Sequence, residues 1–399
     1  MKIPEEFSDI RPYEPEEMKQ AFEDLLNDRQ FNVIMKGFAP WLPTAVRNAL
    51  LRLAFMGVKT PLDFQKRFMK PLVKHIIRKH CDQCEFDDQA MPKDKRLRYT
   101  FVSNHRDIVL DSAFLDVMLI EHGYPTTVEI GIGDNLLIYP WIKRLVRMNK
   151  AFTVRRGLTA HEMIRSSQLM SEYIHYAVTQ KRENIWIAQR EGRAKDSDDR
   201  TQESVLKMLA MGGTGDNYVD KLRDLNIVPL TISYEFDPCD YLKAQEFHLK
   251  RDNPSFKKSK QDDLDNMKTG IFGYKGCVTY RCGRPVNEWI DELKDLPKNE
   301  FFKELARRMD HEIHAGYEIN AYNCLALDML NGDSLDTTTK FLNYDDELAS
   351  MFKEGFENYL SEQILKINIP KKDMAFLRER MLTMYANPLR NYLEAVKSE

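Results

Sequence analysis

The residues best suited to acid–base chemistry lie in segment 101–111, where a short apolar run ends in a polar turn that contains His105. A histidine with a pKa near ~6.5 can take a proton from a hydroxyl, and a neighbouring carboxylate can fix its tautomer. Asp107 and Asp111 both follow closely, and either could be that carboxylate. A structural role, with His105 capping a turn and Asp111 capping a helix, fits the same pattern. The segment therefore predicts a general base and leaves its partner open.

A second stretch, residues 141–157, contains six lysine and arginine residues and no acid. Arg155 and Arg156 stand where a short apolar run gives way to a helix signal, and arginine can bind a phosphate monoester through two parallel hydrogen bonds. A solvated basic edge explains these two residues equally well, and it is the preferred explanation for Lys143, Arg144 and Lys150. Arg155 and Arg156 are therefore candidate phosphate ligands.

The third candidate is the turn that follows the apolar run 184–188. It contains Glu191 and Gly192, followed by Arg193 and Lys195. A glycine permits a backbone conformation, or a close approach of a ligand, that a side chain would prevent. Loops at the carboxyl ends of strands bind ligands in open α/β sheets. Arg193 and Lys195 are therefore expected to add positive charge to the same anion site.

Short β-rich runs alternate with helical segments between residues 99 and 282, which is typical of βαβ units and a parallel sheet. The clearest helix is expected after Thr159, because Thr159 and Glu162 have the spacing of a capping box ahead of an apolar stripe. The predicted strands are residues 99–103, 127–131, 151–154, 184–188, 227–233 and 277–282. We therefore expect an α/β fold, a mixed and largely parallel sheet flanked by helices, with helical N-terminal and C-terminal additions.

The flanking regions have helical patterns. Thr44 is placed to N-cap an apolar helix, and residues 64–80 form a basic amphipathic helix with a break expected at Pro71. Three helical stretches are expected at 287–316, 345–367 and 371–397, and the lysine-rich segment 250–260 is predicted to be a solvated loop. The expected domains are a helical region at 1–95, an α/β domain at 96–285 and a helical region at 286–399.

Composition and charge exclude several classes of protein. A chain of 399 residues with 43% hydrophobic and 11% aromatic content is globular, neither disordered nor fibrous. The net charge of −3 argues against a surface built for nucleic acid, so no nucleic-acid partner is expected. Six cysteines do not suggest a disulfide framework, and the first residues lack an apolar leader pattern. With no apolar run of about 18 residues, we expect a cytoplasmic protein without a spanning helix.

Four segments, taken in order, resemble the motifs of the glycerolipid acyltransferase superfamily, which includes glycerol-3-phosphate and 1-acylglycerol-3-phosphate O-acyltransferases. The counterparts are His105 with Asp111, Phe152 with Arg155, Glu191 with Gly192 and Arg193, and Val228 with Pro229. The resemblance covers roughly residues 99–236, and the interval between His105 and Asp111 is one residue longer than in the family. A match of four blocks in order is more specific than a match of one.

The resemblance implies that a fatty acyl group moves from a thioester to a hydroxyl of glycerol-3-phosphate or 1-acylglycerol-3-phosphate, in phospholipid biosynthesis. His105 would be the general base and Asp111 its orienting partner. The substrate site would contain Arg155, Arg156, Glu191, Gly192, Arg193 and Lys195. No resident cofactor or metal is implied, and the co-substrate would be acyl-CoA or acyl carrier protein.

Because the products are lipids, we expect peripheral attachment to the inner face of an anionic membrane through residues 31–56 and the basic helix 64–80. Simple packing of these helices on the sheet is an equally good explanation. Two other functions fit the motifs. One is O-acyl transfer to a different lysolipid, such as a lyso-aminolipid, and the other is a catalytically silent protein that binds lipid surfaces.

Overall fold

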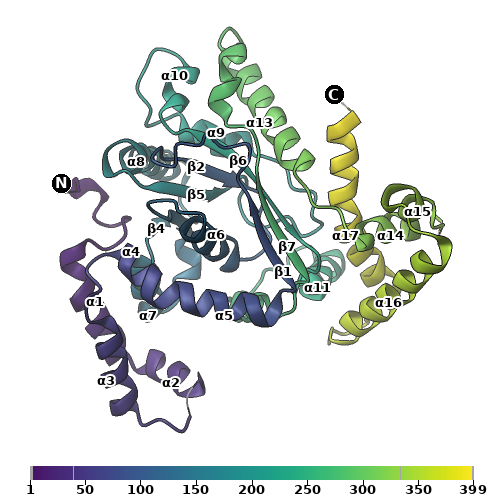
Figure 1. Cartoon of the computed structure of the whole chain (residues 1–399), viewed down its shortest axis with the longest axis horizontal. Helices are drawn as coiled ribbons and strands as arrows, with labels where there is room; N and C mark the ends of the chain where they lie inside the picture. Colours follow the sequence, from purple (N-terminus) through teal and green to yellow (C-terminus); the bar gives the residue numbers. More distant parts are fainter. Residues whose placement is uncertain (1–2, 39, 333, 398–399) are drawn as a thin grey trace.

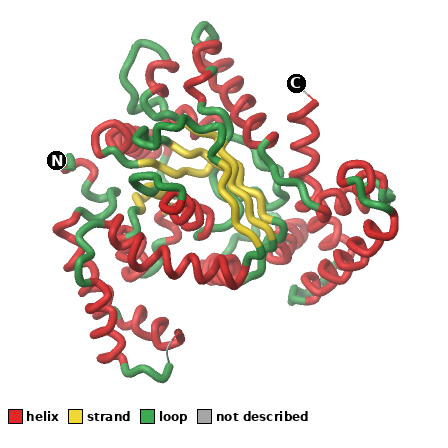
Figure 2. The backbone as a smooth tube through the Cα atoms, viewed as in Figure 1, coloured by secondary structure: helices red, strands yellow, loops and turns green. Residues whose placement is uncertain are grey.

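Seven strands form one mixed sheet at the centre of the computed structural model, which describes residues 3–38, 40–332 and 334–397 (Figures 1 and 2). The strands are β1 Gln83–Asp87, β2 Thr100–Ser103, β3 Val128–Gly133, β4 Ala151–Val154, β5 Asn184–Ala188, β6 Ile227–Tyr234 and β7 Cys277–Cys282. Their order is β1-β7-β6-β2-β5-β3-β4. Strands β6, β2, β5, β3 and β4 run parallel, β7 is antiparallel to β6, and β1 is parallel to β7. The expected α/β fold with a largely parallel sheet is confirmed.

Strand β1 is absent from the sequence-based prediction. It is a short edge strand with the sequence QCEFD, and it pairs with β7. Polar residues are common on edge strands, where they discourage pairing with other chains, and they leave no apolar alternation for a pattern to detect. The other six strands lie where the alternation of apolar runs places them, within a few residues at each end.

Helices cover both faces of the sheet, and alternate residues of a strand face opposite cores. Phe101 of β2 packs with α5 and α6, whereas Val102 packs with α8, α9, α10 and α13, as the pleat of a strand requires. The helices on the first face are α5 Lys70–His80 and α6 Leu110–Glu121. On the second face they are α8 Ala160–Tyr176, α9 Glu203–Leu209, α10 Tyr218–Arg223 and α13 Lys298–Ala315. Thr159 caps α8 in a capping box with Glu162, as predicted.

The N-terminal helices α1 (Pro15–Asn27), α2 (Arg29–Phe38) and α3 (Thr44–Phe55) extend away from the sheet, at the lower left of Figure 1. They share an apolar cluster that includes Phe22, Leu25 and Phe55. The predicted N-cap at Thr44 is wrong by one residue. Pro43 occupies the N-cap, with φ −56° and ψ 141°, and Thr44 is the first helical residue.

The basic helix is continuous through Pro71, contrary to the predicted break. A short helix α4 (Pro61–Phe64) leads into a π-helical turn, Gln65–Met69, and then directly into α5. Pro71 lies in the first turn of α5, directly after the π-helical turn, in which the N–H of Lys70 donates to the carbonyl of Gln65. The wider turn before it supplies the change of hydrogen-bond register.

The predicted loop 250–260 is shorter in the structure. Helix α11 (Asp240–Asp252) continues past Lys250, and α12 (Lys260–Phe272) begins at Lys260, so the loop comprises residues 253–259. Ser259 caps α12 in a capping box with Asp262, a signal present in the sequence.

Four helices form a separate C-terminal cluster at the right of Figure 1. They are α14 Ala321–Leu330, α15 Asp336–Leu342, α16 Asp346–Leu365 and α17 Met374–Lys397. Helix α13, which precedes them, belongs instead to the core beneath the sheet. Helix α7 (Pro140–Met148) lies between β3 and β4 and contributes Met148 to the N-terminal cluster.

Candidate active site

His105 and Asp111 form a hydrogen-bonded pair in the loop between β2 and α6. The Nδ1 atom of His105 lies 2.7 Å from Oδ2 of Asp111. Asp111 also accepts the backbone N–H groups of Arg106, at 2.7 Å, and Asp107, at 3.0 Å. Because an ionised carboxylate can only accept, Nδ1 of His105 carries the proton in the neutral ring and Nε2 has a free lone pair. The His105 side chain is 13% exposed and Asp111 is buried, so the ring has limited access to solvent.

Asp107, the alternative partner, has a different contact set. Its Oδ1 accepts the backbone N–H groups of Val109, at 2.8 Å, and Leu110, at 2.7 Å, and so caps the first turn of α6. Burial and the neighbouring Asp111 raise the pKa of Asp107. Asp111 is therefore the residue that contacts the imidazole, and Asp107 holds the helix start.

The loop of His105, residues 104–109 between β2 and α6, is attached to the sheet by a side chain that the sequence analysis did not single out. Asn104 donates from Nδ2 to the carbonyl of Ile232 in β6, at 2.9 Å, and its Oδ1 accepts the N–H of Ile232, at 2.8 Å. Its amide thereby continues the ladder between β2 and β6 for one more residue. Tyr234, further along β6, donates its hydroxyl to Oδ1 of Asp111 at 3.3 Å. Residues from two strands therefore fix the orientation of the loop.

Ser103 has the contacts of a structural hydroxyl. It is fully buried, donates to the carbonyl of Asn104 at 2.7 Å and accepts the indole N–H of Trp186 at 3.0 Å. The Trp186 ring lies 5.5 Å from the imidazole of His105 in an edge-on contact. Both hydrogen-bonding functions of the Ser103 hydroxyl are occupied, so His105 is the group in this loop that remains available for proton transfer.

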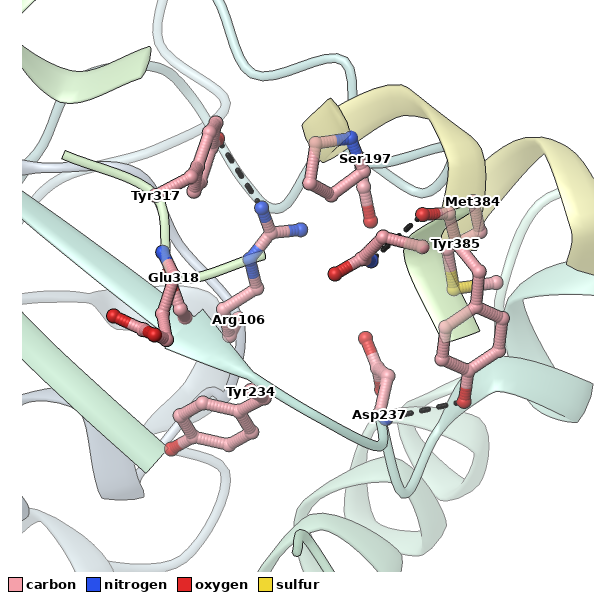
Figure 3. A pocket seen from close by; sticks show the side chains of 11 residues that line it. Arg106, Ser197, Tyr234, Asp237, Tyr317, Glu318, Met384 and Tyr385 are labelled. Atoms are coloured by element: carbon pink, nitrogen blue, oxygen red, sulfur yellow. Dashed lines mark hydrogen bonds between the residues drawn. The ribbon is translucent and has the colours of Figure 1, made fainter. Parts of the chain in front are cut away.

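Arg106, next to His105, extends into a buried network. Its Nη2 lies 3.0 Å from a carboxylate oxygen of Asp199 and donates to the hydroxyl of Tyr317 at 3.2 Å. A cavity of about 20 Å³ adjoins it, between the end of β6 and α17 (Figure 3). In Figure 3 the side chain of Asp237 points into this cavity beneath Arg106. The cavity has room for roughly one water molecule, so it is too small for a substrate.

Arg155 and Arg156 lie beyond the carboxyl end of β4, and acids from other segments meet both of them. Arg155 is 46% exposed and its Nη2 lies 3.4 Å from a carboxylate oxygen of Asp9. Arg156 forms an ion pair with Glu191, and its backbone N–H donates to Asp134 at 3.1 Å. A stretch that has no acid in the sequence therefore has three acidic neighbours in the structure, which weakens its attraction for an anion.

The turn after β5 contains Gly192, whose φ is +70°, a backbone conformation that favours glycine. Arg193 follows it and donates from Nη2 to the amide oxygen of Asn266 in α12, at 3.1 Å. Its Nη1 is buried and has no hydrogen-bond partner among the described residues. Burial acts to lower the pKa of Arg193, but nearby Cys239, Asp237 and Asp107 raise it. Arg193 is therefore a buried cation close to the loop of His105, with one N–H donor that has no partner among the described residues.

Lys195 is directed elsewhere. It forms an ion pair with Glu246 of α11, and burial lowers the pKa of Lys195 to about 8. The structure therefore brings Arg193 toward the loop of His105, pairs Arg156 with Glu191 at the neighbouring strand ends, and directs Arg155 and Lys195 to other acids. Strands β2, β4 and β5 belong to the parallel part of the sheet, so their carboxyl ends point the same way. All these residues follow the carboxyl end of one of these strands.

Comparison with known proteins adds no name. No protein-family model matches the chain, and no curated protein matches it. Among the residues that the structure describes, no helix has both the length and the apolar character needed to cross a bilayer.

Proposed function

We propose that the protein is an O-acyltransferase that moves a fatty acyl group from an acyl thioester to a hydroxyl of glycerol-3-phosphate or 1-acylglycerol-3-phosphate. The observation that carries the proposal is the His105–Asp111 pair, 2.7 Å apart, in the loop after a parallel strand. It leaves Nε2 of the imidazole as a base. A histidine base fits many reactions that begin with proton removal. We propose acyl transfer among them because of the four motif blocks described above.

In the proposed reaction, Nε2 of His105 removes the hydroxyl proton of the acceptor as its oxygen attacks the thioester carbonyl. The tetrahedral intermediate then expels the thiolate, which takes the proton back from the imidazolium. Asp111 holds the ring and stabilises its positive charge between these two steps. The buried donor of Arg193 would bind the phosphate of the acceptor and so hold its hydroxyl near the ring. The transfer needs no covalent intermediate on the enzyme.

The direct test is His105→Ala, assayed with labelled acyl thioester and each acceptor. We expect loss of transfer by at least about 100-fold, the usual contribution of a positioned general base, with an unchanged circular dichroism spectrum. His161, an exposed histidine in the first turn of α8, provides the matched control, and His161→Ala should retain full activity. A folded His105→Ala protein with normal turnover would rule out this base.

One observation favours a second acceptor class. Arg155 and Arg156 are engaged by Asp9 and Glu191, which leaves Arg193 as the free cationic donor near the loop of His105. A lysolipid without phosphate, such as a lyso-aminolipid with one carboxylate, needs only one such donor. A panel of acceptors with and without phosphate separates the two, because the glycerol-phosphate proposal requires at least a tenfold preference for phosphate.

We also propose that the N-terminal helices place the enzyme on an anionic membrane. Val46, Leu50 and Leu53 are exposed by 46%, 52% and 60%, and their spacing puts them on one face of α3. Trp41, in the turn before α3, is 79% exposed. Such a patch is unusual on a protein that contacts only water. Arg78 and Lys79, exposed in the last turn of α5, are further cations of the N-terminal region that could meet anionic lipid.

Sedimentation with vesicles that contain phosphatidylglycerol tests the membrane proposal. Leu50→Glu/Leu53→Glu should reduce the bound fraction several-fold, because each change places a charge where an apolar side chain would enter the lipid. The matched control is Met351→Glu/Leu365→Glu on α16, two residues that are 61% and 73% exposed on the C-terminal cluster. Equal binding by wild type and both variants, or binding that ignores salt, would contradict the proposal.

A further inference from the structure

The most basic surface segment near the active site is residues 250–260, at the end of α11, the following loop and the start of α12. It contains five cations and one acid in a chain whose net charge is −3. Lys257 and Lys260 are exposed, and Arg251 is exposed but forms ion pairs with Asp252 and Asp373. The sequence pattern fits an ordinary solvated loop, but the proposed reaction does not use this local excess of positive charge.

One carboxylate ties this segment to the turn after β5. Glu246 of α11 is 5% exposed, and the Nζ atoms of Lys250 and Lys258 lie 2.9 Å and 3.0 Å from its oxygens. Lys195 contacts the same carboxylate. Three ammonium groups around one acid leave a positive excess even where the segment is packed. The basic segment is therefore held in place, and it is held beside the turn that contains Arg193.

Helix α12 connects the segment with the loop of His105. The amide of Asn266 accepts from Arg193, and Gly270 lies against Asp107, since a Cβ atom there would be 1.9 Å from its carboxylate. Lys260, where α12 begins, is ten residues before Gly270, a rise of about 15 Å along the helix. The exposed cations thus begin one helix length from the loop of His105. A thioester carried at the tip of a flexible phosphopantetheine arm can bridge such a distance.

We propose that residues 250–260, together with Lys195, are the docking surface for an acidic protein that delivers the acyl thioester, a donor of the acyl-carrier-protein class. The cations are spread over two helix ends and a loop, which matches an extended acidic face better than a single phosphate group. This inference rests on the proposed acyl transfer, for which it selects the protein-bound donor over acyl-CoA.

The test compares two donors that carry the same acyl chain, purified acyl carrier protein and coenzyme A. Lys257→Glu/Lys260→Glu should lower kcat/KM with the carrier protein by about tenfold and leave kcat/KM with acyl-CoA unchanged, because rim charges mainly affect the rate of association. The variant should fold, since a glutamate at the start of α12 suits the helix dipole. Lys294→Glu/Lys303→Glu, a reversal of two exposed lysines around the start of α13, is the matched control. An equal fall with both donors, or no fall with either, would overturn the proposal.

Binding of the non-acylated carrier protein, followed by fluorescence anisotropy at low and physiological salt, separates this inference from the proposed function. Weaker binding by Lys257→Glu/Lys260→Glu supports the docking surface even if no acyl transfer is detected, and that result would count against the proposed reaction alone. Transfer from acyl-CoA without binding of the carrier protein would overturn the docking surface and leave the reaction in place.

Discussion

Two aspartates in the loop between β2 and α6 have separate tasks because of which donors surround them. Asp111 accepts one imidazole and two backbone N–H groups of its own loop, and the hydroxyl of Tyr234 in β6. Asp107, three residues before α6, accepts the N–H groups of Val109 and Leu110 at the helix start. An orienting carboxylate must remain an acceptor, whereas a helix cap works as well with an amide as with an acid. The two residues should therefore respond differently to the same substitution.

Asp111→Asn should lower kcat by a factor on the order of 10²–10⁴, because the amide NH₂ group opposes a donor and favours the wrong tautomer of His105. Asp107→Asn should keep activity within a few-fold of wild type, since its Oδ1 can still accept the N–H groups of Val109 and Leu110. Steady-state turnover of both proteins, with melting temperature as the check on folding, decides the matter. Equal losses in the two variants would mean that the hydrogen bond from His105 is not catalytic.

The sequence predicted the base and its two possible partners, but not the residues that hold them. His105 and Asp111 are close in the chain, so a local pattern brings them to notice. Asn104 and Tyr234 are uncovered only when β6 is known to lie beside β2. Arg155 and Arg156 pair with Asp9 and Glu191, which lie in other segments of the chain. The pattern of residues 141–157 alone could not reveal these acids. Pairings between distant segments depend on the order of strands, which the sequence pattern leaves undetermined.

At the scale of elements, α12 approaches the loop of His105 through a glycine. Gly270 is buried in the face of α12 that meets Asp107. Glycine inside a helix usually costs stability relative to alanine, because the free backbone loses more entropy on folding. A glycine is needed at position 270 because no side chain fits between α12 and the carboxylate of Asp107. Gly355 of α16 offers a comparison, because a Cβ atom there would meet nothing within 4 Å.

Gly270→Ala should destabilise the protein by about 1–3 kcal/mol, the usual cost of forcing an extra group into a packed contact. Gly355→Ala should instead stabilise it by about 0.5–1 kcal/mol, since only helix propensity changes. Urea unfolding at constant pH measures both free energies. The displaced Asp107 carboxylate should also reduce turnover in Gly270→Ala alone. Stabilisation of both variants by the same amount would show that α12 does not contact the loop closely.

The predicted elements that matched the structure are those with a strong local signal. The capping box of Thr159 and Glu162 sets the start of α8, and apolar runs set six strands. The predictions that were wrong or absent concern segments whose local sequence fits more than one structure. Pro71 can break a helix or sit in its first turn, and the π-helical turn before it decides the outcome. Strand β1 has no apolar alternation because it lies at the sheet edge.

At the scale of the whole molecule, the C-terminal cluster is joined to the body through a buried acid. Asp240, at the start of α11, accepts the hydroxyls of Tyr359 in α16, at 2.6 Å, and Tyr385 in α17, at 2.8 Å. The neighbouring Asp237 forms an ion pair with Lys243 and lines the small cavity beneath Arg106 (Figure 3). The attachment of the C-terminal helices therefore lies next to the network that leads to the loop of His105.

Burial raises the pKa of Asp240 to about 7, even though the hydroxyls of Tyr359 and Tyr385 act to lower it. A carboxyl whose folded pKa lies above its unfolded value binds more protons in the folded state, so the contribution of Asp240 to stability is highest below about pH 4 and falls as the pH rises through 7. Asp240→Asn removes this titration while its amide oxygen still accepts from the tyrosines. Between pH 5 and 7.5 wild type should lose about 2–3 kcal/mol relative to the variant, measured by urea unfolding of both proteins. Because every other titrating group is common to the two proteins, parallel stability curves would show that Asp240 is already ionised throughout this range.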